Sequence, residues 1–141
     1  MNLKQIKNIT FETFEKYGKV LDFTPGFEGK FEIVVREPDQ PWRLAVLTVK
    51  NRTSAFLENH PQSMESFEPV RGTTLLLVAE NHCPDDFEVF LLDKPVCLYK
   101  GIWHDVIALS DDILIRISEN LDVISEFHHF AKEYTPVLLQ E

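Results

Sequence analysis

Short apolar stretches separated by turn residues dominate the chain after residue 18. Two of them lie between Trp42 and Glu58 on either side of a polar break, and residues 73–79 form a nearly continuous apolar run. A run of this kind is typical of a strand that is buried on both faces. Further short strands are predicted at residues 87–92, 96–99, 106–109 and 112–118. Roughly eight or nine short strands with turn residues between them predict an all-β sandwich or barrel.

The two ends of the chain have a different pattern. Thr10 can cap a short N-terminal helix, and Gly18 can end it. The acidic and aromatic tail, residues 125–141, is compatible with a short C-terminal helix that ends before Thr135. The sequence shows no repeat, low-complexity tract or linker, so residues 1–141 are predicted to form a single domain.

Charge and composition argue against several functional classes. The formal net charge of -9, without a basic block, makes nucleic acid and anionic membrane surfaces poor partners. The apolar runs are too short to span a bilayer, and residues 1–7 lack the apolar region of a signal peptide. The two cysteines, Cys83 and Cys97, are too few for a disulfide framework. We therefore expect a cytoplasmic protein with free thiols and with no nucleic-acid or membrane partner.

Four polar residues are placed so that they can share one site. Glu58 and His60 are two residues apart, so on a strand their side chains point the same way. Glu65 follows a short turn and can lie on a neighbouring strand, and His104 begins another strand after the turn at Gly101. Imidazole and carboxylate groups together suit zinc, manganese, iron or nickel. The alternative is a pair of hydrogen-bonded barrel histidines without a metal.

This spacing resembles the two cupin motifs. The first motif has two histidines one residue apart, then a glutamate, then a glycine. Glu58 stands in the place of the first histidine, while His60 and Glu65 match the second histidine and the glutamate. The segment from Gly101 to His104 matches the end of the second motif. The resemblance implies a cupin-like double-stranded β-helix barrel with four inward side chains that often hold a metal in that family: Glu58, His60, Glu65 and His104.

A second resemblance is to the ureidoglycolate lyase family, which has a cupin-like barrel. The segments that carry it are, in order, residues 12–22, 57–61, 66–69, 76–79 and 101–104. The chain departs from that family at three places. Glu65 stands where the family usually has glutamine, Asp105 replaces a second histidine, and Ser118-Glu119 replaces an Asp-Arg pair. An arginine at that pair would be well placed to hold a substrate carboxylate in a bidentate manner.

The second resemblance implies an enzyme of lyase or hydrolase type that acts on a small polar acid or a ureido compound. Glu65, His104 and His60 are the predicted catalytic residues. Glu58 and Glu65 could act as a general acid/base pair, because burial and a neighbouring carboxylate raise the pKa of a carboxyl group. The alternative for both glutamates is a place on the surface at strand edges. The alternative function is a barrel that binds or senses a small molecule without catalysis.

Three residues are predicted to bind substrate: Glu58, Trp103 and Arg116. Trp103 is interpreted as a wall of the pocket, with an ordinary core tryptophan as the alternative. Arg116 alternates with Ile115 and Ile117, so its side chain faces away from them, either into a polar barrel interior or out to solvent. A pocket that is only structural, in a protein that works through a partner surface, is a third hypothesis. Barrels of this kind commonly pair through edge strands, so we expect a homodimer.

Overall fold

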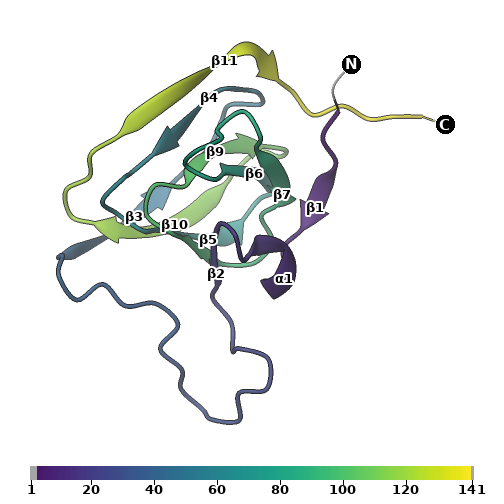
Figure 1. The fold of residues 1–141 in the computed structure, drawn as a ribbon. Helices are drawn as coiled ribbons and strands as arrows, with labels where there is room; N and C mark the ends of the chain where they lie inside the picture. The colour runs from purple at the N-terminus through teal and green to yellow at the C-terminus, as the bar shows by residue number, and fades with distance from the viewer. Residues whose placement is uncertain (1–2, 141) are drawn as a thin grey trace.

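The computed structural model describes residues 3–140, which form two β-sheets packed face to face (Figure 1). The six-stranded sheet has the order β1 (Ile6–Asn8), β7 (Glu88–Leu91), β6 (Thr74–Ala79), β9 (Trp103–Ala108), β4 (Ser54–Asn59) and β11 (Glu126–Tyr134). The five-stranded sheet has the order β2 (Gly18–Val20), β8 (Val96–Leu98), β5 (Glu65–Arg71), β10 (Leu114–Asn120) and β3 (Trp42–Leu47). No helix within these residues is long and apolar enough to cross a membrane.

The strand order defines the topology of the barrel. The eight consecutive strands from β3 to β10 divide into two antiparallel halves, with the orders β3-β10-β5-β8 and β4-β9-β6-β7. Two interleaved four-stranded halves of this kind make a jelly roll, the architecture to which cupins belong. The predicted all-β, cupin-like double-stranded β-helix is therefore confirmed.

The main core lies between the two sheets and explains the apolar run of the sequence. In β6, Leu76 and Val78 face this core, whereas Leu75 and Leu77 face a second apolar cluster on the outer side of the six-stranded sheet. All six residues of β6 are buried. The prediction of a strand buried on both faces is confirmed.

The short N-terminal helix, α1 (Phe11–Phe14), is also confirmed. Thr10 caps it, because its side chain accepts a hydrogen bond from the backbone N–H of Thr13 at 3.0 Å. The helix ends earlier than expected, and Gly18 begins β2 instead of ending the helix. A Cβ atom at Gly18 would lie 2.1 Å from the carbonyl oxygen of Cys97, so β2 can approach β8 only with glycine here.

The C-terminal helix that we considered is wrong. Residues 126–134 form β11, which pairs antiparallel with β4 (Figure 1). Phe130 and Tyr134 pack against Phe87 on the outer side of the six-stranded sheet. The tail is a strand because β4 would otherwise be an edge with unpaired backbone groups, and tertiary partners of this kind override local composition.

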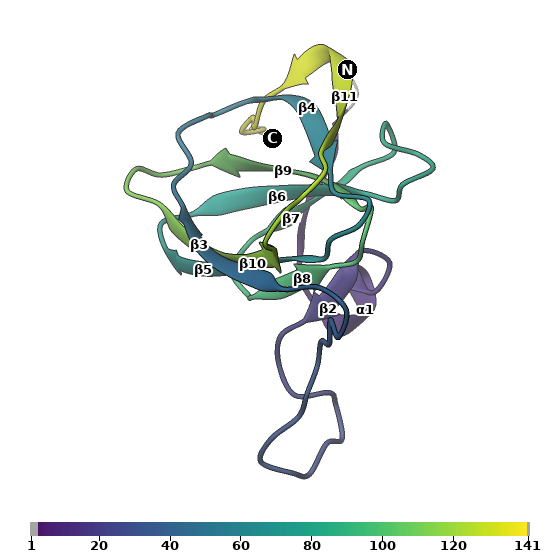
Figure 2. The same ribbon diagram turned by 90° about the vertical axis from the view of Figure 1, so that its left-hand side faces the viewer.

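A long arm, residues 21–41, connects β2 to β3 and contains no helix or strand. It extends away from the two sheets in both ribbon views (Figures 1 and 2). Irregular connections of this length are uncommon in compact domains, and they are usually either functional loops or linkers.

Candidate metal centre and binding cavity

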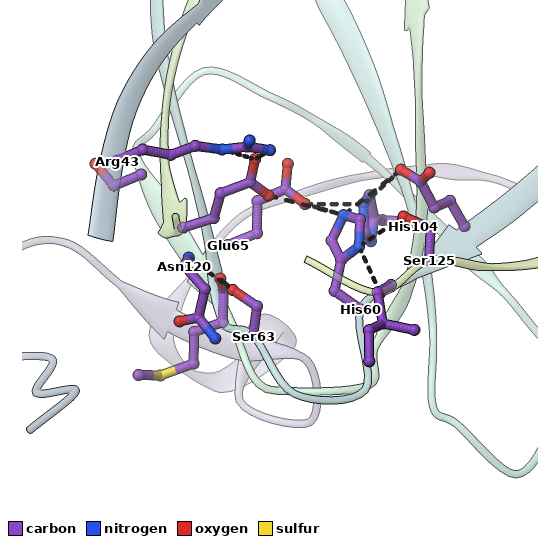
Figure 3. A network of polar contacts seen from close by, with 12 residues as sticks. Arg43, His60, Ser63, Glu65, His104, Asn120 and Ser125 are labelled. Carbon is purple, nitrogen blue, oxygen red and sulfur yellow. Dashed lines mark hydrogen bonds and ion pairs between the residues drawn. The ribbon is translucent and has the colours of Figure 1, made fainter. Parts of the chain in front are cut away.

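Five polar side chains from both sheets meet inside one end of the barrel (Figure 3). Glu58 and His104 are directly opposite each other in the register of β4 and β9. Glu65 and Glu119 are opposite each other in the register of β5 and β10. His60 follows the last residue of β4, and its Nε2 atom lies within 4 Å of a carboxylate oxygen of each of the three glutamates. The four residues that the sequence placed together therefore do lie together, and Glu119 joins them.

The two imidazoles face one carboxylate oxygen. His60 Nε2 lies 3.1 Å and His104 Nε2 lies 3.0 Å from Glu65 Oε1. The Oε1 atom of Glu58 is farther away, at 3.5 Å from His60 Nε2 and 3.9 Å from His104 Nε2. Both histidines and Glu65 are buried, whereas Glu58 is half-buried. Glu65 is thus the centre of the cluster, and Glu58 closes it on the more open side.

Backbone carbonyl groups set the orientation of both rings. His60 Nδ1 lies 3.2 Å from the carbonyl oxygen of Ile124, and His104 Nδ1 lies 3.0 Å from that of Ile102. A carbonyl oxygen only accepts hydrogen bonds, so Nδ1 of His104 carries the proton and donates it. A proton on Nδ1 of His60 is donated in the same way to Ile124, and the Ser125 hydroxyl, 3.2 Å from this atom, can accept it as well. In the neutral form of each ring, Nε2 then holds a free lone pair that faces the cluster. This is the arrangement by which proteins prepare histidines as metal ligands.

Burial and charge act against each other on the pKa values of this cluster. Burial alone would raise the pKa of Glu65, but the charge of His104 and His60 outweighs it and lowers this pKa to about 2. Burial would lower the pKa of His104, but Glu65 outweighs it and raises this pKa to about 9. The pKa of His60 is raised by Glu65 in the same way, against burial. The expectation of a raised pKa at Glu65 is therefore wrong, since it ignored the two imidazoles.

The donor groups fit a divalent cation. The Oε1 atom of Glu65 is buried, and the Nε2 atoms of His60 and His104 both lie within 3.1 Å of it. Two sets of donor atoms each lie within 4.8 Å of one another: Glu58 with His60 and His104, and His60 with Glu65 and Glu119. Two imidazole nitrogens with carboxylate oxygens form a ligand set that zinc, manganese, iron and nickel accept. The cluster therefore has the composition and the spacing of a metal centre.

A cavity of about 310 Å³ opens beside this cluster. Glu58, Glu65, His104 and Glu119 form its polar end. Most of the rest of its wall is apolar, with Thr48, Asn51 and Asp105 as the polar exceptions. The apolar side chains are Ala45, Val46, Leu47, Val49, Phe56, Phe67, Val106 and Ile117. The cavity thus joins a charged end to a largely apolar chamber that is large enough for a small molecule.

Glu119 is a site residue that the sequence reasoning missed, and Arg43 binds it. Arg43 donates from Nη2 and Nε to Glu119 Oε2, at 2.6 and 3.1 Å. The two residues are opposite each other in the register of β10 and β3, so they form one cross-strand pair. One signal was available, because Glu119 has the same strand parity as the buried Ile115 and Ile117. That parity places Glu119 on the inner face.

Of the three residues predicted to bind substrate, Glu58 lines the cavity, whereas Trp103 and Arg116 do not, and their predicted places are corrected. Trp103 faces the outer apolar cluster of the six-stranded sheet, opposite to its neighbour His104, and its Nε1 donates to the carbonyl oxygen of Asn81 at 2.9 Å. Arg116 is exposed, whereas Ile117 beside it is buried in the core. Both corrections follow from the alternation of side chains along a strand.

No protein family matches the chain by its sequence profile, and no curated protein is similar to it in sequence. The resemblance to ureidoglycolate lyases is therefore not confirmed and stays a prediction. The fold and the site together define a cupin-like β-barrel protein with an acidic, histidine-containing cluster.

Two solved structures illustrate which folds are similar to that of this chain. A Bacillus subtilis oxalate decarboxylase, which has Mn(II) centres, matches with a TM-score of 0.48 and 16% identity over 64% of this chain. The chain spans only 24% of the length of that enzyme. A dTDP sugar isomerase from Desulfovibrio desulfuricans G20 matches with a TM-score of 0.44 and 10% identity, over 86% of this chain and 80% of the isomerase.

Proposed function

We propose that the protein is a metal-dependent enzyme of lyase or hydrolase type that acts on a small ureido compound or small polar acid. The supporting observation is the pair of histidines whose Nδ1 atoms are held by backbone carbonyls while both Nε2 atoms face Glu65. Glu58, His60, Glu65 and His104 would hold a divalent ion such as zinc, manganese, iron or nickel. When bound, such an ion polarises a substrate oxygen as a Lewis acid.

The residues of the chain itself have three roles in this proposal. His60 and His104 hold their rings in a fixed orientation, so the site needs little rearrangement when it is loaded. Glu65 is a ligand and not a base, because a carboxyl group with a pKa of about 2 binds a proton weakly near neutral pH. The apolar wall around Phe67 and Val106 keeps water away from the substrate.

Loading with metal should stabilise the protein and allow turnover. We expect each fitting ion, added to chelator-treated protein at about 100 times its Kd, to stabilise the folded state by about 2.7 kcal/mol. Thermal unfolding measures this, and turnover assays on small ureido compounds and acids follow on each stabilised form. Turnover that depends on the ion supports the proposal. Stabilisation without any turnover would instead favour a barrel that binds or senses a small molecule. If no ion stabilises the protein, both the proposed metal site and the proposed metal-dependent activity are contradicted.

A specific observation supports the non-catalytic alternative. The family Asp-Arg pair is replaced by Ser118-Glu119, and Arg43, the arginine nearest to this position in the register, is bound to Glu119. No free guanidinium is therefore offered to a substrate carboxylate at this place within residues 3–140. The turnover assays above separate the two functions.

We also propose that two copies of the chain pair through the arm, residues 21–41, and the free edge of β3. Phe31 in the arm is 82% exposed, and Leu44 and Val46 on β3 are 88% and 73% exposed. Residues 31–36 contain three β-branched residues, which favour a strand, yet no backbone N–H of this segment donates to another backbone group in the described chain. In a two-fold dimer, residues 31–36 of one copy can pair as a strand with the edge of β3 of the other copy.

The dimer is tested by its mass in solution. We expect the wild-type chain to have twice the mass of one chain in light scattering coupled to gel filtration. Leu44→Glu with Val46→Lys should give the mass of one chain, because the apolar edge becomes charged. Leu138→Glu is the matched control, since Leu138 is 99% exposed and lies outside the arm and β3. A wild-type chain that stays monomeric at about 100 μM, where a standard-size interface of micromolar affinity is formed, would contradict the proposal.

A further inference from the structure

One oxygen of Glu119 is left without a partner inside the site. Glu119 is buried, with 6% of its surface exposed. Its Oε2 atom accepts both hydrogen bonds from Arg43, and Arg43 Nη1 also donates to the carbonyl oxygen of Leu121 at 3.2 Å. Its Oε1 atom is buried, has no hydrogen-bond partner within residues 3–140, and lies 3.8 Å from His60 Nε2. The arginine thus fixes the carboxylate in one orientation and leaves one acceptor facing inward.

An unpaired buried acceptor is costly, so its presence indicates a partner that binds at this place. Glu119 lines the cavity, together with Glu58 and Glu65. Within residues 3–140 no lysine or arginine lines this cavity, since Arg43 reaches Glu119 from beside it. An ionised carboxylate only accepts hydrogen bonds. The polar end of the cavity is therefore rich in acceptors, and its histidine, His104, is already paired with Glu65.

We propose that Glu119 determines substrate specificity, by accepting a hydrogen bond at Oε1 from an N–H group of a neutral ureido or amide compound. An anionic carboxylate at the same place would face the buried Oε1 atom of Glu119 directly, and two ionised carboxylates cannot form a hydrogen bond with each other because both only accept. Arg43 is a positioning residue, which acts only by holding Glu119. This inference rests on the proposed function, and it narrows the two substrate classes given there to the neutral one.

Acetamide and acetate are suitable probes, because they have the same shape and differ in donor groups and charge. Their affinities are measured by nuclear magnetic resonance titration of the full chain, both chelator-treated and zinc-loaded. We expect Glu119→Gln to reduce the preference for acetamide over acetate by about tenfold, since a hydrogen bond to a charged acceptor is lost and repulsion of the anion is relieved. Zinc affinity, measured separately, should stay unchanged.

Three further variants complete the test. Arg43→Gln should reduce the preference as Glu119→Gln does, and Arg43→Lys should restore part of it, which a merely structural role would not do. Glu68→Gln is the matched control, because Glu68 lies on the adjacent strand β5 and pairs with the exposed Arg116 on the outer face. This control should leave the preference unchanged.

Two outcomes would overturn the inference. The first is an acetamide preference that is the same in the wild type and in Glu119→Gln. The second is a loss of zinc affinity in Glu119→Gln, because Glu119 would then be a metal ligand in the set that it forms with His60 and Glu65. Failure of the proposed metal function can be told apart from failure of this inference. In that case the wild type would not bind zinc at all, but the chelator-treated wild type and Glu119→Gln would still differ in their preference for acetamide over acetate.

Discussion

Replacing both His60 and His104 by alanine should abolish the binding of divalent metal ions, with the Kd raised more than about a hundredfold. Loss of a group that merely orients a ligand already costs about 10- to 100-fold in affinity. The double variant removes both nitrogen donors, whose Nε2 atoms lie 3.1 and 3.0 Å from Glu65 Oε1. It also leaves only carboxylates, which suit harder ions than zinc or nickel. Elemental analysis of the purified and reloaded proteins measures the effect.

The matched control is His82→Ala with His129→Ala, which removes two exposed histidines outside the cluster. This control should bind as much metal as the wild type. Thermal unfolding shows whether the double variant of the cluster is folded, and His104→Gln offers a second variant that keeps the volume of the side chain. Metal retained by the cluster variants at the wild-type level would contradict the metal centre. So would a wild type that binds no metal after reloading.

The barrel could be predicted because its signals are local. The alternation along each strand, the turn residues between strands and the doubly buried run of β6 are each contained in a few neighbouring residues. The spacing of Glu58, His60 and Glu65 is local in the same sense, and a single later turn brings in His104. These features were therefore accessible without any knowledge of which strands pair.

The parts that could not be predicted depend on partners far away in the chain. Arg43 and Glu119 are 76 residues apart, and only the register of β3 and β10 makes them neighbours. Residues 126–134 are a strand because β4 offers an edge, which their composition does not report. The pKa of Glu65 is lowered because two imidazoles from different segments meet it. Each failure concerns a tertiary contact and not a local propensity.

The metal-free protein should lose stability as the pH rises from about 6.5 to about 9. The ordinary pKa of His104 is 6.5, and Glu65 raises it to about 9 against the effect of burial. A group whose pKa is raised in the folded state contributes its full stabilisation below its unfolded pKa and loses it through its folded pKa. A pKa shift of this size corresponds to about 3 kcal/mol in the free energy of unfolding. His60, with a pKa raised in the same direction, adds to the loss.

The acid side of the same interaction has the opposite sign. The ordinary pKa of Glu65 is 4.5, and the imidazoles lower it to about 2, so its contribution is present above pH 4.5 and is lost as the pH falls to about 2. Both shifts describe one ion pair seen from its two partners, so the stabilisation is counted once. The metal-free protein should therefore be most stable between about pH 4.5 and 6.5.

Bound metal should offset the loss of stability that the metal-free protein shows at alkaline pH. A divalent ion competes with the proton on Nε2 of His60 and His104, so metal affinity should rise up to about pH 9, while the stability of the metal-free protein falls between about pH 6.5 and 9. Denaturant unfolding at each pH, with and without zinc, measures both trends. Glu65→Gln is the deciding variant, because removal of the carboxylate returns the histidines toward their ordinary pKa values and should flatten the fall above pH 6.5. A wild type and a Glu65→Gln variant with parallel profiles over this range would show that the imidazoles and Glu65 are not coupled as the structure requires.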